Sequence, residues 1–528
     1  MRDFIKSKRF KVIGYILFTL FCAIVLTLSI RGLSGNPNVT ELNRLAWKDN
    51  GPLELSPERG RYALTYAIVE THKLSLSPAI ARFSAPDVGY LNGKYVSLFA
   101  PTVSFIVIPG YLLGKIFGFA QVGAFAVVAL FALLNVFLIR AIVVRLGMRS
   151  LVGLIAGITF LFGTPAFAYA VTLYEHHIST FIILMSIYLL TRFNSILSLI
   201  AIWMLCGLSV SVDYPNFFMM LPIGVATLGR LVFVNQEASR LAFKISLPRV
   251  LTIFSIILPL AFFLWFNFAS NGSPFLLSGA VDRSLEVKAN GAPVLESTVV
   301  LQRLKEAGQP AIMPQGTLLN LFNPRDMMNG FYIHFLSPDR GTIMYAPVML
   351  FGVAGLLLAI KRKVKYVSLF VAIIGFNVLL YSMWGDPYGG WSFGSRYLIP
   401  SYAILSIFVA YILTQIARYN LLLLLFFVVF TYSVGVNTLG AITSNRNPPQ
   451  VEAQALVKVS GKDQPYTYIR NFNILNTDTS KAVVFETFAG NYITAWNYYM
   501  YLTSFIVIVS AFLIMSLKAL SKGRRNEL

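Results

Sequence analysis

The chain has 528 residues, of which 56% are hydrophobic and only 12% are charged. Its mean hydropathy is +0.69. Soluble proteins carry about twice this charged fraction, so the composition excludes an ordinary soluble domain and predicts a polytopic membrane protein. Lys and Arg number 43 against 22 Asp and Glu, a net charge of +21. The basic residues lie mostly in short loops between apolar segments. This excess therefore follows the positive-inside rule and does not indicate nucleic-acid binding.

The N-terminus and the two cysteines narrow the class further. The first apolar run follows MRDFIKSKRFK and has no clear small-residue cleavage site, so we expect a retained signal anchor with a cytoplasmic N-terminus. Cys22 and Cys206 both fall inside apolar segments. They therefore predict neither a disulfide framework nor a thiolate metal site.

Apolar segments recur along the whole chain, and a membrane-spanning helix needs roughly 20 residues. They predict an all-α fold, a bundle of about 12–13 transmembrane helices. The segments are 12–30, 101–118, 120–139, 150–170, 178–191, 197–212, 215–235, 250–268, 343–360, 366–383, 398–416, 420–440 and 496–517.

The basic clusters predict which loops lie outside a plasma (inner) membrane. We expect residues 1–440 to form one transmembrane domain whose extracytoplasmic loops are 31–100, 269–342 and 384–397. Residues 441–528 then add an extracytoplasmic segment, 441–495, a final transmembrane helix and a basic cytoplasmic tail. If 101–118 and 120–139 both crossed, the basic run after residue 139 would lie outside. Segment 101–118 is therefore expected to be non-spanning or only partly inserted.

The first outer loop is the most chemically loaded stretch. Ser56 followed by Pro57 reads as an N-cap with proline at the first helical position, and this predicts a helix carrying Glu58 and Arg61. The helix is expected to lie along the membrane surface. A turn at Asn92-Gly93 follows, before the segment opened by Pro101.

Two acids in this loop are candidate general bases, Glu58 and Asp87. A carboxylate within hydrogen-bond reach of an acceptor hydroxyl can take its proton as attack develops. The competing interpretation is that Glu58 only caps its own helix, near the positive end of the helix dipole.

Other polar residues also fall on the predicted outer face, where ionisable groups beside membrane segments are functional candidates. Arginine and lysine could hold a phosphate, or could instead tether loops to carbonyls or lipid headgroups. The candidates for phosphate or donor binding are Arg61, Lys94, Tyr95, His176, Arg340, Arg396 and Tyr397. The candidates for acceptor or sugar binding are Glu175, Asp213, Trp384 and Trp391, and the two tryptophans also fit an interfacial aromatic belt.

The pair His176-His177 beside Glu175 does not predict a metal site. Consecutive residues on a helix face different directions, so no i, i+4 ligand pair forms. A hydrogen bond from one histidine to a phosphate, a sugar or a carboxylate is the preferred interpretation.

Several of these patches resemble the GT-C superfamily of membrane glycosyltransferases. The similarity is to the bacterial branch related to protein mannosyltransferases and lipid A aminoarabinose transferases. The matching stretches are GRYALTYAIVE, PDVGYLNGKYVSLFAP, TPAFAYAVTLYEHH, DYP, SPDRG and WSFGSRYLIP. The family's usual Asp-Glu dipeptide is replaced by Pro57-Glu58, so the resemblance leaves the base open between Glu58 and Asp87.

The resemblance implies a GT-C-like fold and a polyprenyl-phosphate-linked sugar as donor. Transfer would proceed with inversion to an extracytoplasmic lipid, glycan or protein acceptor. Metal dependence varies across the superfamily, so a divalent cation stays open, although the sequence has no acidic cluster that demands one. A lipid-linked oligosaccharide polymerase or ligase, or a flippase, is the alternative. A flippase would predict charged residues at mid-membrane depth and related helical halves, and neither is visible in the sequence.

Overall fold

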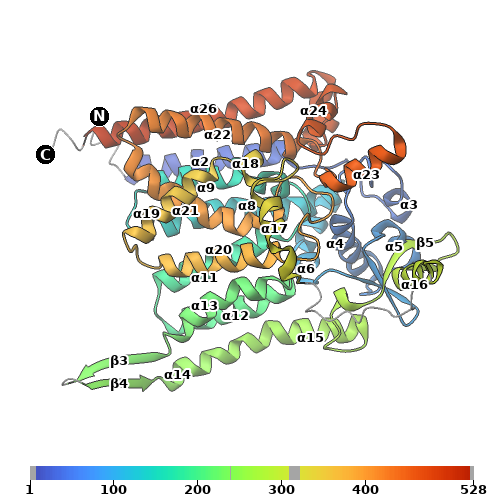
Figure 1. The fold of residues 1–528 in the computed structure, drawn as a ribbon, viewed down its shortest axis with the longest axis horizontal. Coiled ribbons are helices and arrows are strands. Elements are labelled where there is room, and N and C mark those ends of the chain that lie inside the picture. The colour runs from blue at the N-terminus through green and yellow to red at the C-terminus, as the bar shows by residue number, and fades with distance from the viewer. Residues whose placement is uncertain (1–7, 238–239, 308–321, 524–528) are drawn as a thin grey trace.

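The computed structural model describes residues 8–237, 240–307 and 322–523. Long helices run side by side in a bundle, and shorter helices and strands gather at one end of it (Figure 1). The first helix begins and the last helix ends at the opposite end, where a two-stranded hairpin also projects from the other side of the bundle (Figure 1). We call the first end the outer end and the second the basic end. Their orientation across a membrane stays a prediction.

Six stretches of the described chain are helical, long and apolar enough to cross a membrane. They belong to α2 (Lys8–Ser29), α8 (Ala120–Arg145), α14 to α15 (Leu247–Asn271), η6 with α21 (Arg396–Ile416), α22 (Asn420–Ile442) and α26 (Ala495–Gly523). Shorter helices of the bundle are α9 (Ser150–Phe162), α11 (His176–Arg192), α12 (Ile196–Val212), α13 (Asn216–Leu228), α19 (Met349–Lys361) and α20 (Val367–Ser382). The predicted all-α membrane fold is confirmed.

Two predicted segments are too long. Segment 150–170 is split, because α9 ends at Phe162 and α10 (Ala166–Ala170) starts only after Pro165. Proline has no N–H to donate and cannot continue the helix ladder. Segment 215–235 is wrong at its end, where α13 stops at Leu228 and strand β3 (Val232–Glu237) pairs with β4 (Arg240–Ile245).

Segment 101–118 forms two short helices, α6 (Thr102–Ile106) and α7 (Ile108–Ile116). Its far end returns to the outer end of the bundle, where the N–H of Gly35, just beyond α2, donates to the carbonyl of Gly118 at 2.6 Å. Both ends of the segment therefore lie at the outer end, which agrees with the prediction that it is non-spanning or only partly inserted, and α8 carries the following basic run to the opposite end.

Helix α7 packs on the first turns of α8 through glycines. A Cβ on Gly110 would lie 2.3 Å from the carbonyl oxygen of Gly123, and a Cβ on Gly123 would lie 2.1 Å from that of Gly110. No side chain fits at such separations, so the two backbones touch directly. This contact fixes the non-spanning segment against the bundle.

The outer end also holds a small antiparallel sheet with the strand order β2-β1-β5-β6. Strands β1 (Val88–Leu91) and β2 (Lys94–Ser97) form a hairpin, and Asn92 and Gly93 both have positive φ, which confirms the predicted turn. Strands β5 (Arg283–Val287) and β6 (Pro293–Leu295) come from the second outer region, 269–342. Region 269–342 is thus joined to the first outer loop by strand pairing that the sequence did not predict.

Short helices complete the outer end. They are α3 (Val39–Leu42), α4 (Ser56–Tyr66), η1 (Ala67–Thr71), α5 (Pro78–Ser84), η3 (Ser278–Ala280), α16 (Glu296–Glu306), η5 (Pro324–Asp326), α17 (Met327–Phe335), α18 (Thr342–Tyr345), α23 (Gln450–Ser460), α24 (Ile469–Asn476), α25 (Val483–Thr487) and η7 (Ala489–Asn491).

A buried ionic network centred on Glu54 ties the two outer halves together. Arg31 Nη1 lies 3.0 Å from Glu54 Oε1, and Lys481 contacts the other carboxylate oxygen. Ser444 Oγ donates to that oxygen at 2.9 Å, and Arg31 Nε donates to the carbonyl of Ala441 at 2.9 Å. Residues more than 400 positions apart in the sequence are therefore held by one carboxylate.

The glycine contact between α7 and α8 gives a stability prediction. Gly123→Ala forces the two backbones apart and should cost about 1–3 kcal/mol, the usual range for overpacking. Gly375→Ala in α20 is the matched control, because a Cβ there meets nothing within 4 Å. The control should be neutral or stabilising, by up to ~1 kcal/mol. Thermal unfolding in detergent measures both, and equal behaviour of the two variants would contradict the close contact.

Candidate functional site

Helix α4 positions the first candidate residues. It begins at Ser56 with Leu55 as N-cap, one residue earlier than predicted, and Pro57 lies in its first turn. Ser56 does not cap the helix, because its hydroxyl donates to the carboxylate of Asp87. Glu58 does part of the capping, since the N–H of Leu55 donates to Glu58 Oε2 at 3.3 Å. The predicted capping role of Glu58 is confirmed, and it leaves Oε1 available.

Five of the candidates converge at the outer end of the bundle: Arg61, Glu175, His176, Asp213 and Arg396. We call them the outer cluster. Arg61 Nη2 forms a buried ion pair with Glu175 Oε2, and His176 Nδ1 lies 3.3 Å from Glu175 Oε1. The charges of Glu175, Arg61 and Arg396 all act on the carboxyl of Asp213. These residues come from α4, from the turn between α10 and α11, from the end of α12 and from η6 (Arg396–Leu398).

Arg396 is enclosed by tyrosines. Its guanidinium carbon lies 5.1 Å from the ring centre of Tyr174 and 5.3 Å from that of Tyr397. Tyr397 in turn stacks on Tyr381 with 4.2 Å between ring centres. Arg396 Nη2 donates to the carbonyl of Gly389 at 3.0 Å, and a Cβ on Gly389 would lie only 3.1 Å from the Tyr397 ring. The absence of a side chain at Gly389 thus allows this close approach of the backbone to Tyr397.

Several donors of the outer cluster point into buried space without an acceptor. Nε and Nη1 of Arg396, Nε of Arg61 and Nε2 of His176 have no hydrogen-bond partner in the described part of the chain. Unpaired buried donors on a cation are costly, and native structures normally satisfy them. An anionic or strongly polar ligand between Arg61 and Arg396 would supply the missing acceptors.

The carboxyl groups of Glu175 and Asp213 differ in their ionisation. Burial opposes ionisation of Glu175, but Arg61, His176 and Arg396 together outweigh it and hold the pKa of Glu175 below its usual range. Burial, together with the nearby charge of Glu175, raises the pKa of Asp213 above its usual range. With Asp213 protonated, Arg61, Arg396 and ionised Glu175 leave one net positive charge. The cluster therefore favours an anion.

Glu58 lies at the edge of the outer cluster, and its charge acts on the hydroxyl of Tyr174. Its side chain is fully buried, and Oε1 has no partner among the described residues. Burial, and next the charge of Glu54, raise the pKa of Glu58 to about 8. A carboxylate with so high a pKa is a stronger base than an ordinary glutamate.

The structure places Asp87 elsewhere. Asp87 is half-buried beside the small sheet, where Arg283 Nη1 lies 3.3 Å from Asp87 Oδ1. The same arginine pairs with Glu296 at 2.8 Å. Asp87 therefore belongs to an ion-pair chain of the outer sheet, and in the described part of the chain it forms no hydrogen bond or ion pair with the outer cluster.

The hairpin residues also stay outside the outer cluster. Lys94 is exposed at the start of β2. The hydroxyl of Tyr95 donates to the carbonyl of Gly291 at 2.9 Å and so fastens the hairpin to the loop between β5 and β6.

Arg340 is fully buried and holds the loop that leads to Arg396. Its Nη1 donates to the carbonyls of Tyr388 and Gly390 and to the hydroxyl of Ser392. Its Nε lies 3.2 Å from Asp339 Oδ2. These contacts give Arg340 a tethering role, which was the alternative to phosphate binding.

The two tryptophans occupy different places. Trp384 packs edge-on against Phe322 at 5.5 Å and against Tyr381 at 5.9 Å, so it adjoins the tyrosine stack beside Arg396. Trp391 instead lies under the guanidinium groups of Arg446 and Arg470, at 5.2 and 5.7 Å.

The two histidines face apart, as the sequence predicted. His176 turns toward Glu175, whereas His177 Nε2 lies 2.7 Å from the carbonyl oxygen of Ala166. In the described part of the chain, no three His, Cys, Asp or Glu side chains gather closely enough to hold a metal ion.

Sequence reasoning missed Tyr174, Tyr381 and Glu54. Tyr174 lies within a motif already singled out, and Tyr381 lies three residues before Trp384. Nothing in their spacing showed that Tyr174 flanks Arg396 or that Tyr381 stacks on Tyr397. Glu54 precedes the predicted helix by two residues and gave no signal, because its partners are distant in sequence: Arg31 at the end of the first apolar segment, and Ser444 and Lys481 after residue 440.

Comparisons with known proteins give similarity to solved structures alone. No protein-family model matches the chain, and no curated protein matches it. The crystal structure of ArnT from Cupriavidus metallidurans in the apo state is similar at 14% identity and a TM-score of 0.45, covering 96% of this chain and 76% of that one. The same protein bound to undecaprenyl phosphate is similar at 13% identity and a TM-score of 0.43, with the same coverage. Likeness at this level does not establish an activity, so the functional case rests on the outer cluster itself.

The burial of Glu58 gives a pH prediction. Its pKa is about 8 in the folded chain and about 4.3 when unfolded, so the folded state binds the proton more tightly. The stability this provides is complete below about pH 4.3 and falls as pH rises through 8. Glu58→Gln, which stays neutral, should gain in melting temperature relative to the wild type between pH 5 and pH 8.

Glu306→Gln, at an exposed carboxylate of α16, is the control and should follow the wild type at every pH. A parallel pH profile for Glu58→Gln and wild type would show that Glu58 is already ionised in the folded protein.

Proposed function

We propose that this chain is an integral membrane glycosyltransferase. It takes a sugar from a polyprenyl-phosphate-linked donor and transfers it, with inversion, to an extracytoplasmic hydroxyl or amine. The observation that carries the proposal is Arg396, which is enclosed by tyrosines and has two guanidinium nitrogens without an acceptor. The motif resemblance supports the same reaction.

A phosphate monoester fits the outer cluster by charge and by donor geometry. Arg396 presents Nε and Nη1 without an acceptor, so its guanidinium can donate to phosphate oxygens from two nitrogens. Arg61 adds a second cation, and its ion pair with Glu175 holds it in place. As the bond between the anomeric carbon and the phosphate oxygen breaks, negative charge grows on the phosphate. Donors already fixed around it stabilise that charge most.

The base of the proposed reaction is Glu58. The acceptor oxygen or nitrogen attacks the anomeric carbon, the leaving phosphate keeps the electron pair of the broken bond, and Glu58 Oε1 takes the acceptor's proton. Oε1 is unpartnered and the pKa of Glu58 is near 8, which suits proton transfer close to neutral pH. Asp87 is the weaker candidate, because Ser56 and Arg283 already occupy its oxygens.

The sugar and the acceptor would lie against the remaining groups of the site. Tyr397, Tyr381 and Trp384 offer aromatic faces, and Asp213 and His176 offer hydrogen bonds. Whether the sugar is a hexose or a pentose, and whether the acceptor is a lipid, a glycan or a protein, are left to the assay. Lys94, Arg340 and Trp391 have no place in this proposal.

The test is transfer of radiolabelled sugar from a panel of polyprenyl-phosphate donors by the purified protein. Arg396→Gln should lower kcat/KM by about 10²–10³-fold, the usual cost of one transition-state donor. Arg396→Lys should recover part of this, because lysine restores the charge without the paired donors. Arg362→Gln, at an exposed arginine of the basic end, is the matched control and should keep full activity.

The base is tested in the same assay. Glu58→Gln should lose about 10²–10⁴-fold in rate, whereas Asp87→Asn should lose only a few fold. In the wild type, kcat/KM should rise with pH up to about 8, as Glu58 becomes ionised. Loss of transfer in Asp87→Asn alone would reassign the base. A folded wild type that transfers from no donor would argue against glycosyl transfer, and movement of the lipid-linked sugar between leaflets would then be measured.

A further inference from the structure

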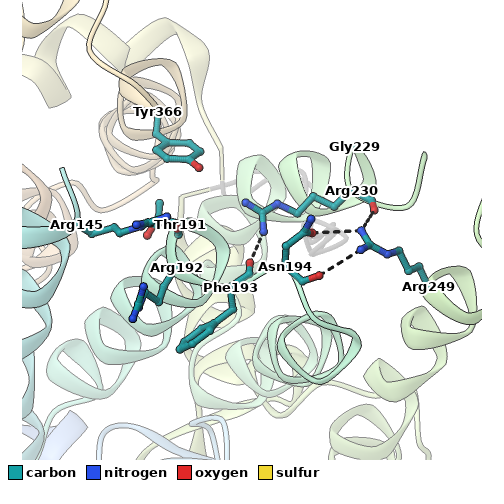
Figure 2. A pocket seen from close by; sticks show the side chains of 9 residues that line it. All are labelled: Arg145, Thr191, Arg192, Phe193, Asn194, Gly229, Arg230, Arg249 and Tyr366. Atoms are coloured by element: carbon teal, nitrogen blue, oxygen red, sulfur yellow. Dashed lines mark hydrogen bonds between the residues drawn. The ribbon is translucent and has the colours of Figure 1, made fainter. Parts of the chain in front are cut away.

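An arginine-lined pocket lies at the basic end of the bundle, opposite the outer cluster (Figure 2). Its volume is about 320 Å³, and it opens where four helices of the bundle begin or end. The lining residues are Arg145, Thr191, Arg192, Phe193, Asn194, Gly229, Arg230, Arg249 and Tyr366. None of them is acidic, and neither the sequence motifs nor the proposed reaction uses this pocket.

The arginines meet around the turn that follows α11. Arg145 Nε, from the end of α8, donates to the carbonyl of Thr191 at 2.8 Å, and Arg230 Nη1 donates to that of Phe193. Arg249 Nη2, from α14 (Leu247–Val250), donates to the carbonyl of Asn194 at 3.2 Å (Figure 2). These bonds satisfy carbonyls at a helix end, which would be a sufficient structural role for one arginine.

The pocket contains four arginines, which is more than these carbonyls require. Within the described chain, Arg145 uses only its Nε, so its two terminal nitrogens keep their hydrogen-bonding capacity. Arg192 makes no hydrogen bond there and rests on the ring of Phe193 at 5.6 Å. Arg145, Arg192 and Arg230 form no ion pair with any described carboxylate. Their charges are thus brought together without compensation, which makes the pocket a site for an anion.

An apolar groove lies between α13 and α20. Its volume is about 500 Å³, and it is lined by Leu221, Pro222, Val225 and Ala226 of α13 and by Ser368, Leu369, Ala372 and Phe376 of α20. Leu221, Val225 and Gly229 recur every four residues, so groove and pocket share one face of α13. Tyr366, which lines the pocket, directly precedes α20, whose first residues line the groove.

Pocket and groove together follow α13 from residue 229 back to residue 221, which is about 12 Å along a helix. This approaches half of the roughly 30 Å hydrocarbon layer of a bilayer, so the groove can hold part of one acyl chain. A charged pocket at the membrane surface and an apolar groove beneath it match the two parts of a phospholipid. A free anion would need only the first.

We propose that this pocket and groove bind one anionic phospholipid of the leaflet at the basic end. Its headgroup phosphate lies among Arg145, Arg192 and Arg230, and one acyl chain lies between α13 and α20. The site is separate from the outer cluster, so it does not depend on the proposed transfer reaction. In this site the arginines bind a headgroup phosphate, in addition to contributing to the general excess of positive charge at this end.

Native mass spectrometry of the full-length protein, titrated with phosphatidylglycerol or phosphatidylcholine, tests the proposal. Phosphatidylglycerol should bind more tightly, and replacing each of Arg145, Arg192 and Arg230 by Gln should weaken it about fivefold, the usual effect of one basic residue near an anionic surface. Ala372→Trp fills the groove and should weaken it as well. Arg362→Gln, an arginine of the same end that hydrogen-bonds Gln415 outside the pocket, should bind as the wild type does.

Two results would overturn the proposal. Equal binding of both lipids, unchanged in the arginine variants, would remove the headgroup site. Full competition by inorganic phosphate, together with normal phosphatidylglycerol binding by Ala372→Trp, would leave an anion site without a lipid chain. Arg192→Gln guards against misfolding, because Arg192 holds no backbone carbonyl in the described chain, and its melting temperature in phosphatidylcholine should equal that of the wild type.

Discussion

The buried carboxylate of Glu54 is the constraint on which the outer end depends. Burial opposes its ionisation, but Lys481 and Arg31 outweigh that cost and hold the pKa of Glu54 below its usual range. The Glu54 carboxylate thereby holds together the residues that follow α2, the segment that precedes α4 and the turn after α22. Removing one partner of such a group leaves an uncompensated buried charge, which typically costs 3–5 kcal/mol. The same charge also helps keep Glu58 protonated, so the scaffold sets the chemistry of the proposed base.

The charged residues of the outer cluster have two different roles. Arg61 and Glu175 form an ion pair, and the guanidinium of Arg61 also lies over the rings of Phe99 and Tyr174, so this pair shapes the site at little electrostatic cost. Arg396 has no carboxylate partner among the described residues, and its charge is available to a ligand. Because tyrosine faces are polarisable and exclude water, they stabilise the guanidinium while keeping the surrounding dielectric low. A phosphate entering this space would interact far more strongly than at an open surface.

Local sequence signals predicted local structure well, and they predicted the site in part. The Asn92-Gly93 turn, and a helix beginning at Ser56-Pro57 within one residue of its predicted start, depend on a few neighbouring residues, although Leu55 and not Ser56 is the N-cap. Arg61, Glu175, His176, Asp213 and Arg396 were chosen as ionisable residues on the predicted outer face, and the structure brings these five together. Asp87 and Lys94 were chosen on the same ground in the first outer loop. The pairing of β1 with β5 takes them elsewhere, and strand pairing across almost 200 residues leaves no local pattern.

The contrast between the two arginine sites follows from where each one lies. At the outer cluster, Arg396 sits beneath tyrosines with part of its donor set unpaired, so a ligand must shed its water to bind and gains strong, oriented contacts in return. At the basic end, Arg145 and Arg192 are exposed and their contacts are screened by water. Such contacts are weak singly, and they hold a lipid only if the groove between α13 and α20 adds apolar burial. A reaction in which negative charge develops on a leaving phosphate needs the first kind of site. Binding a lipid in its leaflet needs only the second.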